Sequence, residues 1–376
     1  MLSYWETSEL LSYDTIIIGG GIVGLSAAAS LKEKNPAMRI AVIERGILPT
    51  GASTRNAGFA CFGSVSELLA DLKNLSPEQM LTLVKMRWQG LQRLRQRLGD
   101  TAIGWEHFGG YELLFEKDLQ VSDQISHLNK LLSEIFPKAV FSETKQNPQD
   151  FGFAPQQVKK LIFNAYEAQI NTGKMMRHLW EYVARLGVNM LTGTNITSFE
   201  TTASGASVVA KSPFGDIVFT ARNLAICTNA FARQLLPKLD LSPGRGQVLI
   251  TKPLPQKLSW RGIFHYDEGY YYFRNIGDDR ILFGGGRNID FVGENTETFG
   301  NSPQILGALT QHLREIIIPQ QNFEIAQTWS GIMAFGDNKM PIVEKINDSV
   351  VVAVRLGGMG VALGSLLGEK VADFLV

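Results

Sequence analysis

Three glycines near the N-terminus, Gly19, Gly21 and Gly24, have the spacing with which a backbone can approach a phosphate group. They follow an apolar run at 15–18, which we expect to be a buried strand, and they open an alanine-rich helix. Gly19 permits a tight turn, Gly21 lets the backbone approach a pyrophosphate, and Gly24 lets the helix and the strand pack closely. The pattern predicts a phosphate-binding turn.

An acidic residue ends the next expected strand, at 40–43. Glu44 comes 20 residues after Gly24 and is placed to accept hydrogen bonds from an adenosine ribose, with Arg45 beside it. The helix offers the phosphates the positive end of its dipole and its first N–H groups, which include those of Ile22 and Val23. An ordinary βαβ unit with a glycine-rich turn would leave Glu44 unexplained, so the sequence predicts a dinucleotide site.

Length and composition indicate a two-lobed, soluble protein without a strong electrostatic field. The chain has 376 residues, with 45% hydrophobic and 19% charged residues. Lys+Arg and Asp+Glu both number 36, so no net charge attracts nucleic acid or an anionic membrane. The N-terminal segment does not resemble a signal peptide, and no run of 18 apolar residues occurs. We therefore expect a cytoplasmic protein without nucleic acid or membrane partners.

Residue types that often bind metals or form disulfides are sparse. Cys61 and Cys227 lie far apart and belong to no ligand cluster, which argues against a disulfide framework and against a zinc site. The five histidines are scattered without a motif. We expect no metal.

A loop of small residues, 51–58, reads GASTRNAG. Its small side chains would let the backbone lie along an extended cofactor, while Ser53, Arg55 and Asn56 could serve diphosphate and ribityl oxygens. Only one glycine fingerprint is present, which disfavours a flavin–nicotinamide reductase with two such folds, and no P-loop motif occurs. The residues assigned to the cofactor here are Gly51, Ala52, Ser53, Arg55, Asn56, Ala57 and Gly58.

With these motifs together, the chain resembles the FAD-dependent oxidoreductases of the D-amino-acid oxidase family, which includes glycine and sarcosine oxidases. GASTRNAG looks most like the amine-oxidising branch that includes gamma-glutamylputrescine oxidoreductase. Further segments match the family's ordered series of motifs: AICTNA at 225–230, RGQ at 245–247, the hairpin at 271–286, WSG at 329–331 and the glycine turn at 357–363. The resemblance implies non-covalent FAD, held also by Ile196, Thr228, Asn229, Ala230, Trp329, Gly331, Gly358, Met359, Gly360 and Val361.

The closing glycine turn has a physical logic of its own. A helix that begins near Gly358–Val361 would aim its free N–H groups at the flavin N1 and C2 oxygen, where negative charge develops on reduction. An ordinary helix after a glycine C-cap is the alternative.

The fold class expected is α/β (α+β, two domains), with a Rossmann-like FAD-binding domain built from discontinuous segments and an inserted, sheet-rich substrate domain. We assign 1–100, 151–240 and 325–376 to the first domain, and 101–150 and 241–324 to the second. Within these, we expect a hairpin at 103–116 and helices at about 118–135 and 173–186.

The resemblance implies oxidation of a carbon–nitrogen bond, in which hydride passes to flavin N5 and the imine hydrolyses. Tyr272 and Arg274 share one face of a strand and are the substrate-pocket candidates. They could clamp an anionic group, or Arg274 could pair with Asp278 or Asp279 at the hairpin end.

Amino-acid oxidases of the family place an arginine shortly after WxG, where this chain has Ile332 and Met333. The substrate expected is therefore an amine, a secondary amine or a longer amino-acid derivative, with oxygen or another carrier as electron acceptor. Cys61 lies near the 51–58 loop and is either a covalent flavin ligand, as in some relatives, or an inert buried residue. The alternatives are a flavin monooxygenase, which NADPH would reduce, and a non-catalytic flavoprotein.

Overall fold

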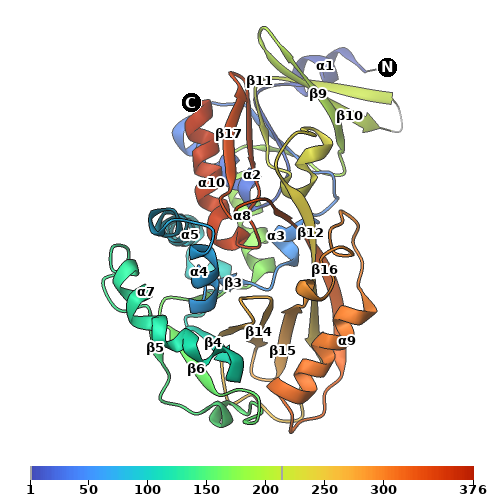
Figure 1. The fold of residues 1–376 in the computed structure, drawn as a ribbon. Helices are drawn as coiled ribbons and strands as arrows, with labels where there is room; N and C mark the ends of the chain where they lie inside the picture. The colour runs from blue at the N-terminus through green and yellow to red at the C-terminus, as the bar shows by residue number, and fades with distance from the viewer. Residues whose placement is uncertain (1, 213–214) are drawn as a thin grey trace.

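Two large sheets form the two halves of the chain, in a computed structural model that describes residues 2–212 and 215–376. Figure 1 shows the first sheet in the upper half, beside the chain termini, and the second in the lower half. The path of the first sheet is β17-β18-β11-β1-β2-β8, and β9 and β10 extend it through β11. Its strands are β1 (Ser12–Ile18), β2 (Ile40–Ile43), β8 (Asn189–Leu191), β9 (Ile196–Thr202), β10 (Gly205–Ser212), β11 (Gly215–Ile226), β17 (Ile342–Asn347) and β18 (Val350–Val354).

The first sheet has a parallel centre because its inner strands are apolar on both faces. β1 pairs in parallel with β2 and with β11, and β11 pairs in parallel with β18. Residues 15–18 and 40–43 are all buried, as a sheet covered on both sides requires. β1 therefore lies at the centre, and the fingerprint that follows it opens at the carboxyl edge of the sheet.

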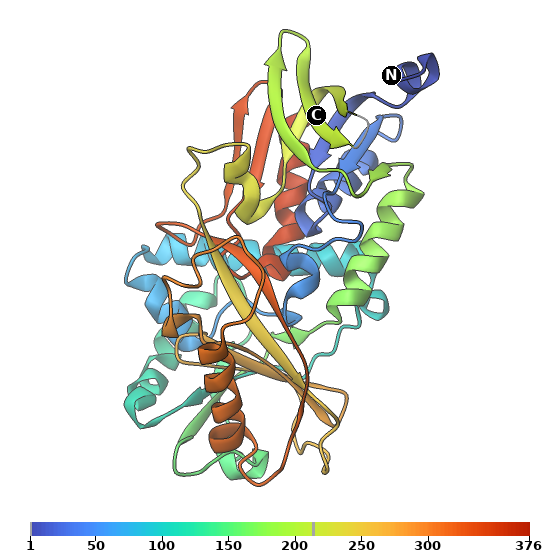
Figure 2. The same ribbon diagram turned by 90° about the vertical axis from the view of Figure 1, so that its right-hand side faces the viewer.

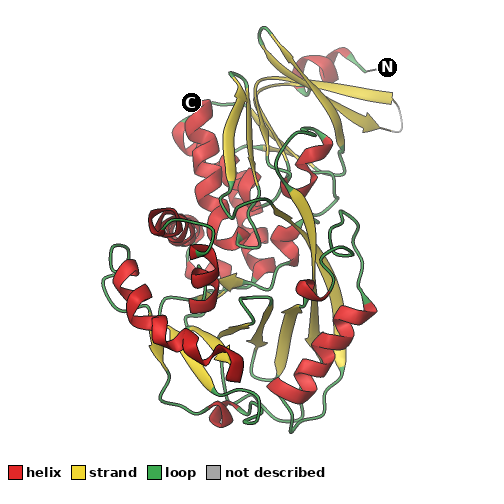
Figure 3. Cartoon of the chain, in the orientation of Figure 1, coloured by secondary structure: helices red, strands yellow, loops and turns green. Residues whose placement is uncertain are grey.

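Helices from both ends of the chain pack together on this sheet (Figure 3). They are α2 (Ile22–Lys34), α5 (Pro77–Leu98), α8 (Thr172–Arg185) and α10 (Gly360–Leu375). A Cβ on Gly364 of α10 would lie 2.5 Å from Cγ2 of Ile22, and one on Gly368 would lie 2.5 Å from Cβ of Ser26. Glycine at these two positions lets α10 approach α2 closely, which joins the two ends of the chain.

The second sheet has the order β16-β12-β15-β14-β13-β4-β6-β5. Its strands are β4 (Gly110–Leu114), β5 (Phe141–Glu143), β6 (Lys160–Asn164), β12 (Ser242–Thr251), β13 (Ile263–Tyr266), β14 (Tyr271–Ile276), β15 (Arg280–Gly285) and β16 (Ile325–Phe335). Stacked and edge-to-face aromatic rings, among them Phe264, Phe273 and Phe283, fill the core beneath it together with α9 (Pro303–His312). In Figure 2 the long strands β12 and β16 run between the two halves of the molecule.

Shorter elements connect these parts. The helices are α1 (Tyr4–Glu9), α3 (Ala52–Arg55), α4 (Val65–Leu72), α6 (Asp100–Ile103) and α7 (Ile125–Leu132), with the short helical turns η1 (Glu116–Gln124), η2 (Pro148–Phe151), η3 (Asn229–Gln234), η4 (Arg287–Ile289) and η5 (Leu313–Ile317). β3 (Phe59–Ala60) and β7 (Ala168–Gln169) form a separate pair.

The structure confirms the fold class and differs from the expected elements in three places. β6 and β16 belong to the second sheet, although the sequence-based boundaries put 151–240 and 325–376 in the cofactor domain. The hairpin at 103–116 is absent from this described segment, since β4 pairs with β6 and β13 instead. The helix expected at 118–135 is a 3-10 turn followed by α7, whereas the helix near 173–186 is α8. Each of these differences concerns either strands that pair with distant parts of the sequence or the exact ends of a helix.

Candidate active site

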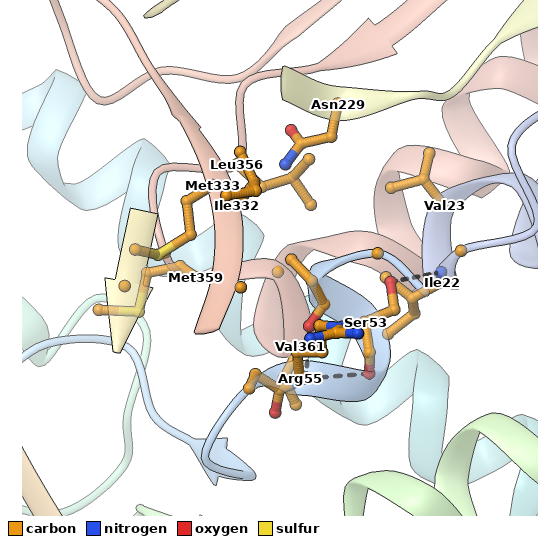
Figure 4. A pocket seen from close by; sticks show the side chains of 18 of the residues that line it. Ile22, Val23, Ser53, Arg55, Asn229, Ile332, Met333, Leu356, Met359 and Val361 are labelled. Carbon is orange, nitrogen blue, oxygen red and sulfur yellow. Dashed lines mark hydrogen bonds between the residues drawn. The ribbon is translucent and has the colours of Figure 1, made fainter. Parts of the chain in front are cut away.

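A cavity of about 450 Å³ lies between the carboxyl edge of the first sheet and the second sheet. Ligands of open parallel sheets bind at this edge. Segments from both chain ends and from the 51–58 loop line it (Figure 4). Of the residues predicted from the sequence, the cavity is lined by Gly19, Gly21, Ile22, Val23, Glu44, Arg45, Gly51, Ala52, Ser53, Arg55, Asn56, Ala57, Ile196, Thr228, Asn229, Tyr272, Gly331, Gly358, Met359, Gly360 and Val361.

The glycine fingerprint forms the turn from β1 into α2. Gly19 has φ +108°, and a Cβ there would lie 2.6 Å from the carbonyl oxygen of Cys227. Gly24 does not line the cavity: a Cβ on it would overlap the carbonyl oxygen of Gly19, which fits its expected packing role. Gly21 is the N-cap of α2 and offers no side-chain cap, so the start of the helix is open to a ligand.

Glu44 is buried at the end of β2, and its carboxylate accepts hydrogen bonds from the backbone of two neighbouring turns, at Gly20 and at Gly46. Oε2 accepts the N–H of Gly20 and Oε1 accepts the N–H of Gly46, each at 2.9 Å. A carboxylate accepts about four hydrogen bonds, so Glu44 keeps acceptor capacity toward the cavity. Its neighbour Arg45 lies over the ring of Phe231, with 3.7 Å from the guanidinium carbon to the ring centroid.

Polar side chains of the 51–58 loop bind the loop to α2 and β16 and hold its own backbone. The Oγ of Ser53 accepts the N–H of Ile22 at 2.9 Å, the bond drawn in Figure 4. Arg55 donates from Nε to the carbonyl oxygen of Thr50 and from Nη1 to that of Ser330, both at 3.0 Å. The side-chain amide of Asn56 donates to the carbonyl oxygens of Ala52 and Ser53.

Three more of the predicted residues lie behind the cavity wall. Gly58 has φ +74°, and a Cβ on it would crowd the carbonyl oxygen of Ile170. Trp329 donates from Nε1 to the carbonyl oxygen of Arg55 at 3.0 Å, and Ala230 is buried in a small core with Ile332. These residues support the lining residues and do not face the cavity.

The C-terminal turn brings α10 to the cavity. Gly357 and Gly358 have φ +55° and +82°, and no side chain among the described residues caps the N-terminus of α10. In Figure 4 Met333 and Met359 lie on one side of the cavity, and Ile22 and Val23 on the other.

The donors and acceptors of this wall fit an extended dinucleotide. Two helix N-termini whose N-cap residues provide no side-chain cap, those of α2 and α10, open into one cavity, and Ser53 accepts only the first N–H of α2. The buried hydroxyl of Thr228 lines the cavity and has no hydrogen-bond partner in the part of the chain that the structure describes. Because buried hydroxyls are normally paired, Thr228 indicates a polar ligand.

Of the two substrate-pocket candidates, the structure places only Tyr272 on the cavity. Its ring meets that of Phe59 edge-on, with centroids 5.6 Å apart, and burial raises the pKa of its hydroxyl to about 12. Arg274 instead points behind the wall, where Nη1 donates to the carbonyl oxygens of Gly58 at 2.9 Å and Ile170 at 2.8 Å.

Both expectations for Arg274 therefore need correction. Its guanidinium does not face the cavity, and Asp278 pairs with Lys257 and Arg261 instead. Two carbonyl oxygens whose chain positions lie more than a hundred residues apart converge on Arg274, which joins the cofactor loop to the second sheet.

The sequence analysis missed a buried cluster around His265, which is cross-strand partner of Tyr272 and lines the cavity. Nδ1 of His265 lies 3.8 Å from Oε2 of Glu67, and Nε2 lies 3.5 Å from Oε2 of Glu167. Burial lowers the pKa of His265, but Glu167 followed by Glu67 and Glu112 outweighs it and raises that pKa to about 8. The sequence could have placed His265 beside Tyr272 only if the register between β13 and β14 had been known.

Cys61 stands beside this cluster. It is buried, and burial followed by the charges of Glu167 and Glu67 raises the pKa of its thiol far above its usual value. Ligand atoms of Cys61, Glu167 and His265 lie within 4.8 Å of one another, a grouping that could hold a metal ion. The thiol contacts Met359, with 3.7 Å between the sulfur atoms.

Arg287 is the second residue that the sequence analysis missed. It begins η4, with one residue between it and β15, and lines the cavity together with Tyr270 and Tyr272. Its guanidinium carbon lies 4.2 Å from the ring centroid of Phe335 and 5.2 Å from that of Phe291. The run of three glycines before it was the only signal in the sequence.

Among residues 2–212 and 215–376, every helix is too short or too polar to cross a lipid bilayer.

Comparisons with known proteins find relatives that span nearly the whole chain. The chain is 24% identical over 371 residues to the probable oxidoreductase OrdL of Rhizobium meliloti, which covers 96% of this chain and 82% of that protein. It is 22% identical over 399 residues to gamma-glutamylputrescine oxidoreductase of Escherichia coli, with 98% and 84% covered. Among solved structures, glycine oxidase from Geobacillus kaustophilus has a TM-score of 0.75 at 20% identity, covering 97% of this chain and 95% of that chain.

A solved structure of L-proline dehydrogenase from P. horikoshii shares the same fold, with a TM-score of 0.75 at 16% identity over 96% of this chain and 93% of that one. The sequence profile described as DAO, FAD dependent oxidoreductase, matches residues 14–374. The chain therefore belongs to this family of FAD-dependent oxidoreductases and is an enzyme with FAD as its cofactor.

Proposed function

We propose that this enzyme oxidises a carbon–nitrogen bond of an amine or an amino-acid derivative. One observation carries the proposal: the cavity of an FAD-dependent oxidoreductase is lined by Tyr272, His265 and Glu67 as well as by the turn at 357–360. An acidic, aromatic wall suits a positively charged nitrogen. The substrates named for gamma-glutamylputrescine oxidoreductase and glycine oxidase both contain an amino nitrogen.

The cofactor would extend along the backbone-lined part of the cavity. We assign its adenosine end to Glu44 and Ile196, its pyrophosphate to the N-terminus of α2, and its isoalloxazine ring to the turn that opens α10. The backbone N–H groups at these two helix starts and the acceptor capacity of Glu44 support this order. The first sheet with α2, α5, α8 and α10 is then the cofactor domain, and the second sheet forms the substrate domain.

Bound FAD supplies an acceptor for the two electrons and the hydrogen that leave the substrate carbon. The chain's own residues have three tasks: to orient that carbon, to exclude water, and to stabilise the charge on the nitrogen. Phe59 and Tyr272 provide the apolar packing, and Glu67 with His265 provides the charge. The nitrogen loses a proton as the C=N bond forms, and water then hydrolyses the imine to a carbonyl compound and ammonia, or to a carbonyl compound and an amine where the substrate nitrogen is secondary.

The test is an anaerobic titration of the holoenzyme with a panel of primary amines, secondary amines and amino acids. Loss of the visible absorbance of oxidised FAD with at least one member is the expected result. The matched alcohol, in which oxygen replaces the nitrogen, should leave the spectrum unchanged. Rapid bleaching by NADPH, with none by any amine, would establish a monooxygenase instead.

A further inference from the structure

Arg287 is a cation without a counterion at the edge of the cavity. Its guanidinium makes no hydrogen bond or ion pair with any residue in 2–212 or 215–376, and its Nε is buried without a partner. Burial lowers the pKa of Arg287 despite the opposing influence of Tyr270 and Glu294. Guanidinium groups in such settings are normally paired, so this arrangement indicates a ligand.

A neighbouring arginine shows the usual solution. Arg245 donates to both oxygens of Glu294, from Nε at 2.9 Å and from Nη2 at 2.7 Å. Glu294 is therefore already engaged and leaves Arg287 unpaired. The guanidinium of Arg287 lies over the rings of Phe291 and Phe335. These contacts use none of its N–H groups, so its planar set of donors is available to a carboxylate.

The wall around Glu67 carries the opposite charge. Oε2 of Glu67 accepts the N–H of Ser64 at 2.9 Å, while Oε1 accepts no hydrogen bond from any residue that the structure describes. A Cβ on Gly269 would lie 2.5 Å from this Oε1, so the carboxylate packs closely against the backbone there. The carboxylates of Glu67 and Glu167 lie 3.8 and 3.5 Å from the two ring nitrogens of His265, and Glu112 is its cross-strand partner, so acidic groups outnumber the single imidazole.

We propose that the cavity recognises its substrate by two opposite charges: Arg287 binds a carboxylate, and Glu67 binds the ammonium group. This inference rests on the proposed function and narrows the substrate to an amine that also carries a carboxylate. Ile332 and Met333 occupy the wall of β16 and offer no cation there. The carboxylate contact therefore comes from the end of β15 in this chain.

The experiment measures the binding of three shape-matched compounds to the holoenzyme by the change in the visible spectrum of bound FAD. Pivalate is the anion, tert-butylammonium is the cation, and pivalamide is neutral. The tert-butyl carbon bears no hydrogen, so none of the three can be oxidised at a C–N bond. The variants are Arg287→Met, Arg287→Lys and Glu67→Gln. Glutamine keeps an oxygen for the N–H of Ser64, and methionine keeps the packing between the two rings.

The two charge variants should lose different ligands. Arg287→Met should weaken pivalate at least tenfold and leave tert-butylammonium and pivalamide unchanged, with Arg287→Lys between it and wild type. Glu67→Gln should weaken tert-butylammonium by about tenfold and leave pivalamide unchanged. Unchanged pivalamide binding shows that each variant is folded. Arg261→Met and Glu324→Gln, exposed ion-pair residues away from the cavity, serve as matched controls.

Equal binding of pivalate and pivalamide by the wild type, no detectable binding of either, or full retention of pivalate by Arg287→Met would overturn the proposal. Stoichiometric metal in the purified enzyme that is lost in Cys61→Ser, with ammonium binding lost as well, would assign the acidic cluster to a metal. None of these readouts needs turnover. A failure here therefore differs from a failure of C–N oxidation, which the amine titration reveals.

Discussion

The two ends of the cavity are built on different principles. The end of the cavity that we assign to the cofactor consists mainly of backbone: glycines, helix N-termini and strand ends. Its largest part lies close together in the sequence, from β1 through α2 to Glu44, and the turn before α10 joins it from the other end of the chain. The substrate end consists of side chains that meet from distant segments, as Glu67 of α4 meets His265 of β13. Binding through the backbone should therefore be sensitive to small changes in the shape of the protein. Binding through side chains should be sensitive to the removal of a charge.

The largest effect should come from adding a single methyl group at the cofactor end. In Gly24→Ala the new Cβ overlaps the carbonyl oxygen of Gly19, so α2 can no longer pack against β1 and its N-terminus moves. We expect loss of nearly all bound FAD, measured as absorbance per purified chain. Gly307→Ala in α9 is the control, because its Cβ would meet nothing within 4 Å. Full FAD content in Gly24→Ala would show that the fingerprint geometry is not required.

Arg274 lies between the cofactor loop and the second sheet, and its removal should lower the stability of the fold. Arg274→Met leaves the buried carbonyl oxygen of Ile170 without its side-chain donor and removes one of two donors to the oxygen of Gly58, which keeps the N–H of Ile170. This should cost about 2–3 kcal/mol of unfolding free energy. Denaturant unfolding measures this loss, and Arg261→Met at an exposed pair should cost less than about 1 kcal/mol. An equal loss of unfolding free energy in the two variants would show that Arg274 does not join the cofactor loop to the second sheet.

The substrate end should make stability depend on pH, and the cofactor end should not. Burial, opposed by hydrogen bonds from Ser66 and Ser64, raises the pKa of Glu112 from 4.5 to about 7. A carboxyl group with a raised folded pKa stabilises the fold below its ordinary pKa and loses that contribution as pH rises through the folded value. His265, with its pKa raised from 6.5 to about 8, acts in the same direction.

The melting temperature should therefore fall as pH rises from 4.5 to about 8, with Glu112 contributing from 4.5 to about 7 and His265 from 6.5 to about 8. Glu112→Gln cannot ionise and should make this fall shallower, whereas Glu324→Gln, an exposed control, should leave it as in the wild type. A melting temperature that rises over the same range would show that the cluster is not buried as the structure has it.

The smallest effect should come from a single capping bond at the cofactor end. Ser53→Ala removes the acceptor of the Ile22 N–H, which should cost about 1 kcal/mol and weaken FAD only modestly. Ser133→Ala, at an exposed helix end, is the comparison. If Ser53→Ala lost as much FAD as Gly24→Ala, the main role of Ser53 would be a direct contact with the cofactor and not the cap of α2.

How far the sequence could predict the molecule follows the same division. The spacing of Gly19, Gly21 and Gly24 identifies the turn because its contacts are local. Nothing local relates Arg274 to Ile170, or His265 to Glu67, since β13 and β14 must first adopt their register. The placement of β6 and β16 in the second sheet was missed for this reason too: strand partners distant in the sequence leave no periodic signal.

The central claim, that the cavity oxidises a carbon–nitrogen bond, is tested most directly by product analysis after one anaerobic turnover. An amine that bleaches the enzyme should yield one equivalent of carbonyl compound and one of ammonia or amine for each FAD reduced. Bleaching after which all of the substrate is recovered with its carbon–nitrogen bond intact would contradict the account.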